Sequence, residues 1–318
     1  MARSTPSTVF CLAAGHNEAT LVRRLFRLLA QQSYPALEFV FVDDGSTDGI
    51  SEYLRTTYPR LHLLRGDGNY WWTGAMRRGV AEILKRTKPG DFVLTINNDC
   101  TFDRQYVQTL VTTSVNHGRA IVGSLAVDRE DQTRIWDGGV AVDWRTGVFS
   151  GLGPARTTAL PQGITVRDDI DTVSTKGTLY PIEVFEQAGN FDDRHLPHYG
   201  SDYEMGIRAK RAGFRLLLSY DARVANEVKR TGYGRTVTSA ISFREFWRLM
   251  FGRRSQVNII DHWQLIRLAC PPYYKPRNYL RVAAKFFYYL AHVPPFSVLL
   301  TPAQALRNRL APPSKRQA

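Results

Sequence analysis

Residues 40–49 read VFVDDGSTDG, an apolar, β-prone run that ends in two aspartates and a polar turn. The run predicts a buried strand, and Ser46, Thr47 or Asp48 can cap a helix over residues 50–58. On the N-terminal side, residues 8–14 predict another strand, followed by a helix that Asn17 can cap and whose leucines recur at helical spacing. This alternation of strands and helices indicates a parallel sheet covered by helices.

The same rhythm continues on the C-terminal side. A short strand at residues 62–64 leads through the turn GDGNYWWTG into a helix expected at residues 75–85, and a strand at residues 91–96 runs directly into Asn97, Asn98 and Asp99. Ligands of open α/β sheets collect at the carboxyl ends of the strands, so we expect Asp43, Asp44 and Asp99 to line one crevice. Residues 120–177 predict strands and loops, and a helix is expected to open after Gly200 and to end at Gly213.

Composition divides the chain in two. The 318 residues are 43% hydrophobic, which suits a packed globular protein, and their formal net charge is +13. That charge belongs to the C-terminal segment, because residues 228–318 contain 16 Lys and Arg but only two acidic residues, Glu245 and Asp261. The three widely spaced cysteines predict free thiols in a reducing compartment. We expect no secretion signal, and no segment reaches the ~18 uninterrupted apolar residues typical of a membrane span.

Each acidic motif has an ordinary structural interpretation when it is taken alone. DDGSTDG favours helix capping, NND is common in turns, and Asp202 could be a first-turn acid favoured by the helix macrodipole. What favours function is that the chain carries all three clusters, at residues 43–48, 97–99 and 201–204. The sequence therefore predicts a polar site built from several strand ends.

Four motifs in order, LAAGHNE, VFVDDGSTDG, LTINNDCTF and HYGSDYEMGIRAKRAGF, together with GDGNYWWTGAMRRG, resemble the family 2 glycosyltransferases. The resemblance covers about residues 8–230 and is greatest to the rhamnosyltransferase-like branch of bacterial polysaccharide-assembly enzymes. It implies a GT-A fold over residues 1–230, which is a Rossmann-like mixed α/β sheet flanked by helices. It also implies an inverting, metal-dependent transfer of a hexose or deoxyhexose from a UDP- or dTDP-sugar to a glycan hydroxyl.

The resemblance assigns roles to individual residues. Asp43, and less certainly Asp44, would contact the nucleobase, Asp99 would bind Mg²⁺ or Mn²⁺, and Asp202 would act as general base. Asn226 stands where many members carry a metal-binding His, so it is a weak second ligand. Further donor-side residues would be Ala14, Asn17, Glu18, Asn69, Trp72, Gly74, Arg77, Asn97 and Asn98. Acceptor-side residues would be Lys176, Gly177, Thr178, Ser201, which replaces the usual Glu, and Glu204.

Residues 231–318 predict a basic, aromatic-rich helical segment. Basic amphipathic helices bind membrane interfaces, so we expect residues 240–300 to attach to the cytoplasmic face of a membrane, where a lipid-linked acceptor would lie. The alternative is a helical subdomain packed on the catalytic domain. Other candidate functions are a nucleic-acid-binding protein, a nucleotidyltransferase and a catalytically inactive scaffold. The acidic clusters count against nucleic acid as a partner, and Asn97, Ser201 and Asn226 keep the scaffold open.

Overall fold

A computed structural model describes residues 6–151, 163–226, 239–294 and 296. The chain forms two compact units, Met1–Thr231 and Gly232–Ala318.

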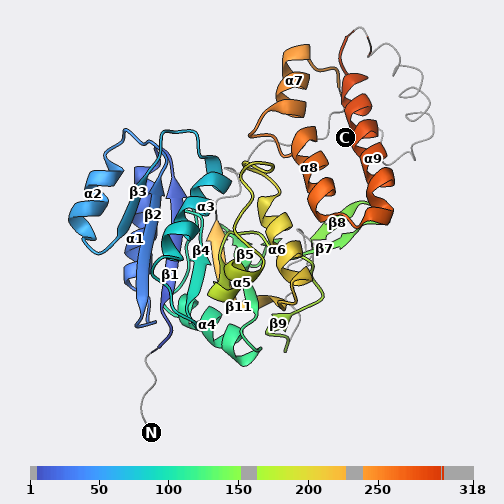
Figure 1. The fold of residues 1–318 in the computed structure, drawn as a ribbon. Helices are drawn as coiled ribbons and strands as arrows, with labels where there is room; N and C mark the ends of the chain where they lie inside the picture. Colours follow the sequence, from blue (N-terminus) through green and yellow to red (C-terminus); the bar gives the residue numbers. More distant parts are fainter. Residues whose placement is uncertain (1–5, 152–162, 227–238, 295, 297–318) are drawn as a thin grey trace. The chain divides into compact units, whose positions relative to one another are not determined.

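The first unit begins with the predicted alternation of strands and helices (Figure 1). The elements are β1 (Val9–Gly15), α1 (Ala19–Ala30), β2 (Leu37–Asp43), α2 (Ile50–Thr57), β3 (His62–Arg65), α3 (Trp71–Ile83) and β4 (Phe92–Thr95). Strands β3, β2, β1 and β4 lie in that order and pair in parallel. Their carboxyl ends, which carry the acidic motifs, therefore meet at one edge of the sheet.

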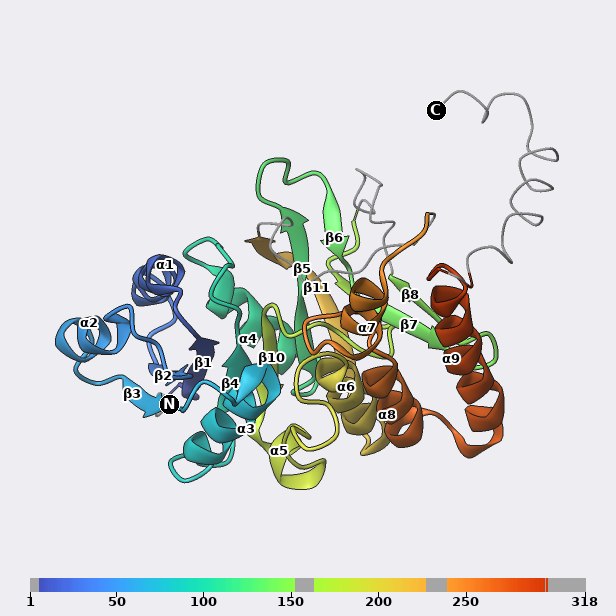
Figure 2. The same cartoon turned by 90° about the horizontal axis from the view of Figure 1, so that it is seen from above.

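The second half of this unit turns the sheet into a mixed one. Its elements are α4 (Tyr106–Asn116), β5 (Ile121–Asp128), β6 (Ile135–Asp137), β7 (Val140–Asp143), β8 (Val148–Gly151), β9 (Val166–Arg167), β10 (Thr178–Pro181), α5 (Ile182–Gln187), α6 (Ser201–Arg211) and β11 (Leu216–Asn226). Strand β10 is antiparallel to both of its neighbours, β4 and β5, and β11 continues the sheet parallel to β5. Strands β7 and β8 form a separate hairpin (Figure 2).

Alternating side chains place the core on both faces of the sheet. Phe10 and Leu12 pack with helices α3, α5 and α6, whereas Val9, Cys11 and Ala13 pack with α1, α2 and α4. This alternation follows from the two-residue period of a strand that is covered on both sides. The three cysteines are buried free thiols, as predicted.

Local details differ from the sequence predictions. Asn17 does not cap α1; instead, Asp48 from the neighbouring loop accepts a hydrogen bond from the Ala19 N–H at 2.8 Å. Helix α3 begins at Trp71 rather than at Ala75. Helices α4 and α5 lie in stretches for which the sequence pattern gave no helix. Such differences arise because tertiary contacts satisfy helix ends that the local sequence leaves open.

The second unit is helical, with α7 (Phe243–Phe251), α8 (Ile259–Ala269), the 3₁₀ turn η2 (Pro272–Tyr274) and α9 (Lys275–Leu290). Ser242 and Asn258 cap α7 and α8 with side-chain oxygens. A small core joins α7 and α9 and contains Ile241, Phe246, Leu249, Met250, Tyr289 and Val293. Within the described residues, every helix is too short or too polar to span a bilayer.

Candidate active site

Two loops at the carboxyl edge of the sheet are hydrogen-bonded to each other. Asn17, in the left-handed region at φ 55°, donates its backbone N–H to Ser46 Oγ at 2.9 Å. In return, its side-chain Oδ1 accepts the Thr47 N–H at 2.8 Å. The loop after β1 and the DDGSTDG turn after β2 therefore form one unit, in which Asn17 links the two loops.

The first aspartate of that turn is fully buried. Asp43 Oδ1 accepts the Ser46 N–H at 2.8 Å, Oδ2 accepts the Ser51 hydroxyl, and Arg65 Nε lies 4.0 Å from Oδ2. In this conformation Asp43 stabilises the turn and offers no exposed surface to a ligand. Each carboxylate oxygen has a further lone pair that can accept a nucleobase N–H. Because the side chain is buried, that contact, which stays a prediction, requires the turn to open.

The second aspartate organises the next loop. Asp44 Oδ1 accepts the Gly68 N–H at 2.9 Å, and Oδ2 accepts the N–H groups of Tyr70 and Trp71 at 3.0 and 3.1 Å. These bonds hold Trp71 at φ 56°, which is unusual for a bulky residue. Asp44 thus fixes where α3 begins. Asn69, on the same loop, is exposed.

The first turn of α3 touches two other parts of the site. Trp72 donates its indole N–H to Asn97 Oδ1 at 3.3 Å, beyond the end of β4. Thr73 donates its hydroxyl to Ser201 Oγ at 2.8 Å, at the start of α6. Further along α3, Arg77 forms an ion pair with Asp193, whose Oδ2 would lie 3.5 Å from a Cβ placed on Gly74.

Beyond β4, Asn98 bridges two strand ends. Its Nδ2 donates to Glu18 Oε2 at 2.6 Å and to the Ala14 carbonyl at 3.4 Å. The next residue, Asp99, is half-buried. Burial is the main cause that raises its pKa above the ordinary aspartate value, while the positive charge of Lys176 acts to lower it. The donor-side residues expected around β1 and β4 therefore lie together.

Lys176 lies on the loop that precedes β10, and its charge acts on two carboxylates from different elements. The positive charge of Lys176 acts to lower the pKa of Asp99 and that of Asp202, against the larger effect of burial, which raises both. Gly177, at φ 149°, has no room for a Cβ, which would collide with the Tyr106 hydroxyl. Thr178 is buried and donates its hydroxyl to the Ser174 carbonyl at 2.8 Å.

Asp202 occupies the first turn of α6, directly after Gly200 at φ 82°. The side chain is half-buried and accepts the Tyr203 N–H at 2.9 Å. Burial is the largest cause that raises the pKa of Asp202 to about 6, and the nearby Asp137 carboxylate on β6 also raises it. At neutral pH Asp202 is therefore mostly ionised and basic enough to accept a proton.

The two flanking α6 residues make internal contacts. Ser201 is 1% exposed and bonded to Thr73, as described above. Glu204 forms a two-point ion pair with Arg208 at 2.7 and 2.9 Å, and Arg208 also donates to the Ala188 and Asn190 carbonyls. This ion pair fixes the segment before α6. The acceptor-side role of Ser201 and Glu204 stays a prediction. The side chain of Asn226, the weak second metal ligand of the sequence analysis, lies outside the described residues.

Sequence reasoning missed Asp137 and an aromatic group that includes Tyr203, the residue after Asp202. Asp137 acts on the Asp202 pKa from β6, and Tyr203 stacks on Phe149 of β8 with ring centroids 5.9 Å apart and planes at 12°. Trp144 packs edge-on against Phe149 at 5.4 Å. Only the tertiary pairing of the β7–β8 hairpin with α6 reveals this group, since the spacing of these residues carries no motif.

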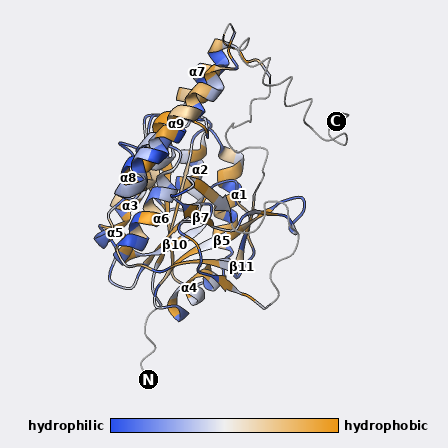
Figure 3. Cartoon of the chain, turned by 90° about the vertical axis from the view of Figure 1, so that its right-hand side faces the viewer, coloured by the Kyte–Doolittle hydropathy of each residue, from blue (hydrophilic) through white to orange (hydrophobic). Residues whose placement is uncertain are grey.

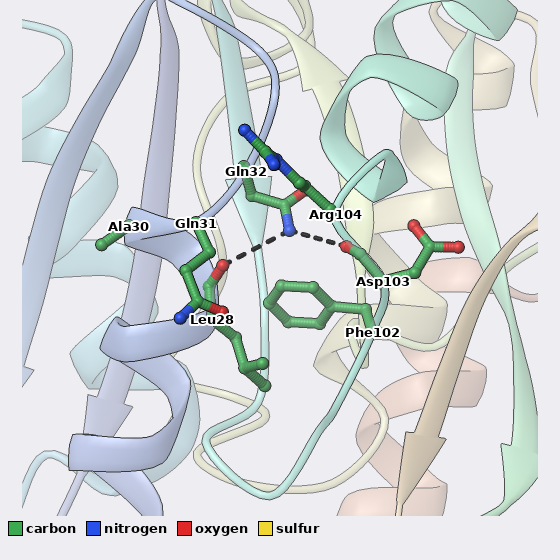
Figure 4. Close-up of a pocket in the computed structure, with 7 residues that line it drawn as sticks. All are labelled: Leu28, Ala30, Gln31, Gln32, Phe102, Asp103 and Arg104. Carbon is green, nitrogen blue, oxygen red and sulfur yellow. Dashed lines mark hydrogen bonds between the residues drawn. The ribbon is translucent and has the colours of Figure 1, made fainter.

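A hollow among the described residues lies elsewhere. Figure 4 shows it between the C-terminal end of α1 and the segment before α4, with a volume of about 450 Å³. Gln32 spans it, donating to the Leu28 carbonyl at 3.4 Å and the Asp103 carbonyl at 2.7 Å. None of its lining residues belongs to the predicted site. The converging strand ends, rather than this hollow, define the candidate active site.

Comparison with protein-family models matches residues 14–171 to glycosyl transferase family 2. About half of the chain therefore resembles glycosyl transferase family 2. The matched residues include Asp43, Asp44 and Asp99, whereas Lys176 and Asp202 lie beyond the match. The matched segment therefore contains the predicted donor-side motifs, and the prediction of Asp202 as general base rests on the motif at α6 and on the surroundings of its side chain.

Solved structures share this fold. A mannosyltransferase from Pyrobaculum calidifontis, solved with GDP-mannose and Mn²⁺, is 19% identical with a TM-score of 0.55, over 95% of this chain and 81% of that one. GalNAc-T7, solved with UDP, GalNAc and Mn²⁺, is 17% identical with a TM-score of 0.59, over 84% of this chain. TarS from S. aureus is 14% identical with a TM-score of 0.53, over 89%. This chain spans 48% of GalNAc-T7 and 43% of TarS.

These likenesses confirm the predicted GT-A fold. At these identities they say nothing further about its substrates. No curated protein matches the sequence.

Proposed function

We propose that the protein is an inverting glycosyltransferase that moves a sugar from a nucleotide sugar to a hydroxyl of a glycan acceptor. The single observation that carries the proposal is that Lys176 acts on the pKa of both Asp99 and Asp202, while its carbonyl accepts the thiol of Cys100, the residue after Asp99, at 3.2 Å. The Lys176 ammonium group, which acts on carboxylates from two separate elements, suits a site where a diphosphate and a nucleophile must approach each other.

The chemistry requires one displacement. Asp202 accepts the proton of the acceptor hydroxyl while the acceptor oxygen attacks the anomeric carbon and the bond to the diphosphate breaks. A pKa of about 6 for Asp202 suits a base at neutral pH. Lys176 stabilises negative charge beside it. A single displacement inverts the anomeric configuration and needs no covalent enzyme intermediate.

The residues present fit Mg²⁺ or Mn²⁺ held jointly with the donor. Among the described residues there is no cluster of three or more His, Cys, Asp and Glu side chains that could hold an ion alone. Mg²⁺, however, commonly takes one or two carboxylates together with substrate phosphates, and Asp99 supplies one carboxylate. Such an ion, when bound, neutralises charge on the departing diphosphate. Two of the structural neighbours were solved with Mn²⁺, which supports this proposal.

The donor is proposed to be a UDP- or dTDP-sugar. A carboxylate such as Asp43 can accept the imide N–H of uracil or thymine, provided that the DDGSTDG turn opens. Neighbours with the same fold were solved with UDP and with GDP-mannose, so guanine nucleotides belong in any screen. Rhamnose is the first sugar to test, because the motifs resemble the rhamnosyltransferase-like branch most.

The acceptor is proposed to be a lipid-linked glycan of cell-envelope polysaccharide assembly. The basic residues 240–300 would then hold the protein at the cytoplasmic face of the membrane, and nucleic acid is not an expected partner. The support is the concentration of Lys, Arg and aromatic residues in the second unit.

Calorimetric titration of the full chain with UDP, dTDP, GDP and CDP, each with Mn²⁺, Mg²⁺ or EDTA, tests the donor site. We expect UDP or dTDP to bind, and EDTA or Asp99→Ala to weaken that binding. Asp202→Asn should bind the nucleotide as the unchanged protein does but transfer sugar about 100-fold more slowly or worse. A folded protein that binds no nucleotide under any of these conditions would favour the inactive scaffold instead.

A further inference from the structure

The second unit exposes an unusual share of large apolar side chains. Of the twelve exposed large hydrophobic residues among the described ones, nine lie between Phe243 and Phe296. Phe243, Trp247 and Phe287 are 61%, 56% and 63% exposed. Scattered single exposures are ordinary on a soluble surface, but contiguous ones mark an interaction site.

Ring contacts join them across two helices. On α7, Phe243 lies 6.4 Å from Trp247 and Trp247 lies 4.4 Å from Phe251, centroid to centroid. Phe251 then lies 6.5 Å from Phe286 of α9, and Phe286 lies 5.6 Å from Phe287. We call these five residues the aromatic ridge. The ridge runs unbroken from α7 to α9, so its exposed rings belong to a single surface.

The surface continues along α9. Leu280, Ala284 and Phe287 follow at four- and three-residue steps, which places them on one face of the helix. Leu280 is 70% exposed, and Ala284 is exposed as well. Figure 3 shows hydrophobic and hydrophilic residues interspersed along α7 and α9. Both helices thus carry apolar side chains on an exposed face as well as on the face that packs in their small shared core.

The positive charge of the same segment favours an anionic partner. Residues 239–296 carry nine Lys and Arg against two acidic residues, Glu245 and Asp261. Arg244 and Arg248 directly follow the exposed Phe243 and Trp247 on α7, and Arg277 is exposed on α9 one turn before Leu280. Aromatic rings prefer the boundary between headgroups and acyl chains, and the cations prefer anionic headgroups. No described helix can span a bilayer, so the arrangement suits helices that lie flat in the interface.

We propose that the aromatic ridge, with Ala284 and Leu280, inserts into the interface of an anionic lipid bilayer while Arg244 and Arg277 contact its headgroups. The inference deepens the proposed function by naming the surface that brings the enzyme to a lipid-linked acceptor. A second copy of this chain is less suited to this surface, because two copies would bring the same positive charges together.

Sedimentation of the full chain with vesicles tests the proposal. We expect the protein to bind vesicles that contain phosphatidylglycerol far better than vesicles of phosphatidylcholine alone, and salt to weaken that binding. The double change Trp247→Ser with Phe287→Ser should weaken binding to the anionic vesicles about tenfold or more, which corresponds to ~1.4 kcal/mol. Circular dichroism establishes that the variant is folded.

The matched control is Val115→Ser with Val148→Ser, which removes two apolar side chains that are 53% and 50% exposed on the first unit. It should leave vesicle binding unchanged. A second variant, Arg244→Gln with Arg277→Gln, keeps the ridge and should lose most of the preference for anionic vesicles. Equal vesicle binding by the ridge variant and the unchanged protein would overturn the proposal.

Two further readouts separate the alternatives. A concentration-dependent dimer in light scattering without lipid, abolished by the ridge variant, would assign the surface to a second copy and overturn the lipid proposal. Nucleotide binding by the ridge variant, measured without vesicles, should equal that of the unchanged protein. If the unchanged protein binds no nucleotide, the proposed glycosyltransferase activity is contradicted, whereas the vesicle result still tests the lipid proposal.

Discussion

Burial, the largest cause, and Asp137 on β6 raise the pKa of the Asp202 carboxylate. The hydrogen bond from the Tyr203 N–H and the charge of Lys176, on the loop before β10, act to lower it. A base with a pKa of about 6 keeps its proton-accepting form above that pH and loses it as the pH falls. If Asp202 is the base, the rate of transfer should therefore depend on the charges of neighbours that do not themselves touch the proton.

This balance gives a pH prediction with two signs. The transfer rate should fall as the pH drops through about 6. Asp137→Asn removes a negative neighbour, so it should shift that fall to lower pH, whereas Lys176→Gln removes a positive one and should shift it to higher pH. Rates measured at saturating donor between about pH 5 and 8, a range that spans the pKa of Asp202, report both shifts. Shifts in the same direction for both variants would contradict the assignment of the base.

Gly177 carries a steric prediction. Its φ of 149° and the nearby Tyr106 hydroxyl leave no space for a Cβ, so Gly177→Ala should lower the free energy of unfolding by about 1–3 kcal/mol. Urea denaturation measures the loss. Gly151→Ala, where a Cβ meets open space, is the control and should change stability by less than about 0.5 kcal/mol.

At the scale of elements, the start of α3 depends on one side chain from a different loop. Asp44 accepts three backbone N–H groups from Gly68, Tyr70 and Trp71. Those bonds begin the helix a turn earlier than its sequence suggests and bring Trp72 to Asn97. Asp44 therefore positions the loop that would surround the donor sugar.

Removing that anchor should cost stability and activity together. Asp44→Ala leaves three N–H groups without their acceptor, so we expect the free energy of unfolding to fall by about 1–3 kcal/mol or more, and nucleotide binding to weaken. Asp67→Ala, which removes one local bond in the same turn, to the Asn69 N–H, is the matched control and should have a small effect. Similar losses in both variants would show that Asp44 has no special positioning role.

On the scale of the whole molecule, the two units have cores of different size. The first unit has extensive buried clusters on both faces of its sheet, whereas the buried cluster described in the second contains six residues from α7, α9 and their flanks. A small core stabilises its helices less, because less apolar surface is removed from water.

Hydrogen exchange should report this difference. Followed by mass spectrometry, amides of α7 and α9 should exchange faster than those of β1 and β4, because smaller units open at lower free energy. Anionic vesicles should slow exchange in α7 and α9 but leave β1 unchanged. Uniform exchange across both units would mean that the chain unfolds as a single cooperative body.

The sequence by itself determined the alternating strands and helices of residues 8–96 and the polar motifs at the ends of those strands. The strands that alternate with helices have continuous apolar runs, and polar turns follow them, so local patterns and the carboxyl-edge rule are sufficient to place Glu18, Asp43 and Asp99. The basic, aromatic character of residues 231–318 was equally clear from composition.

Only the tertiary structure decided which side chains meet. Asp137, Lys176 and Asp202 are separated along the chain, and β10 brings Lys176 beside Asp99 by inserting antiparallel between β4 and β5. The stacking of Phe149 on Tyr203 and the ridge from Phe243 to Phe287 likewise depend on contacts between distant segments. Local sequence sets periodicity and capping, whereas pKa values and continuous surfaces depend on distances in space, which no local pattern encodes.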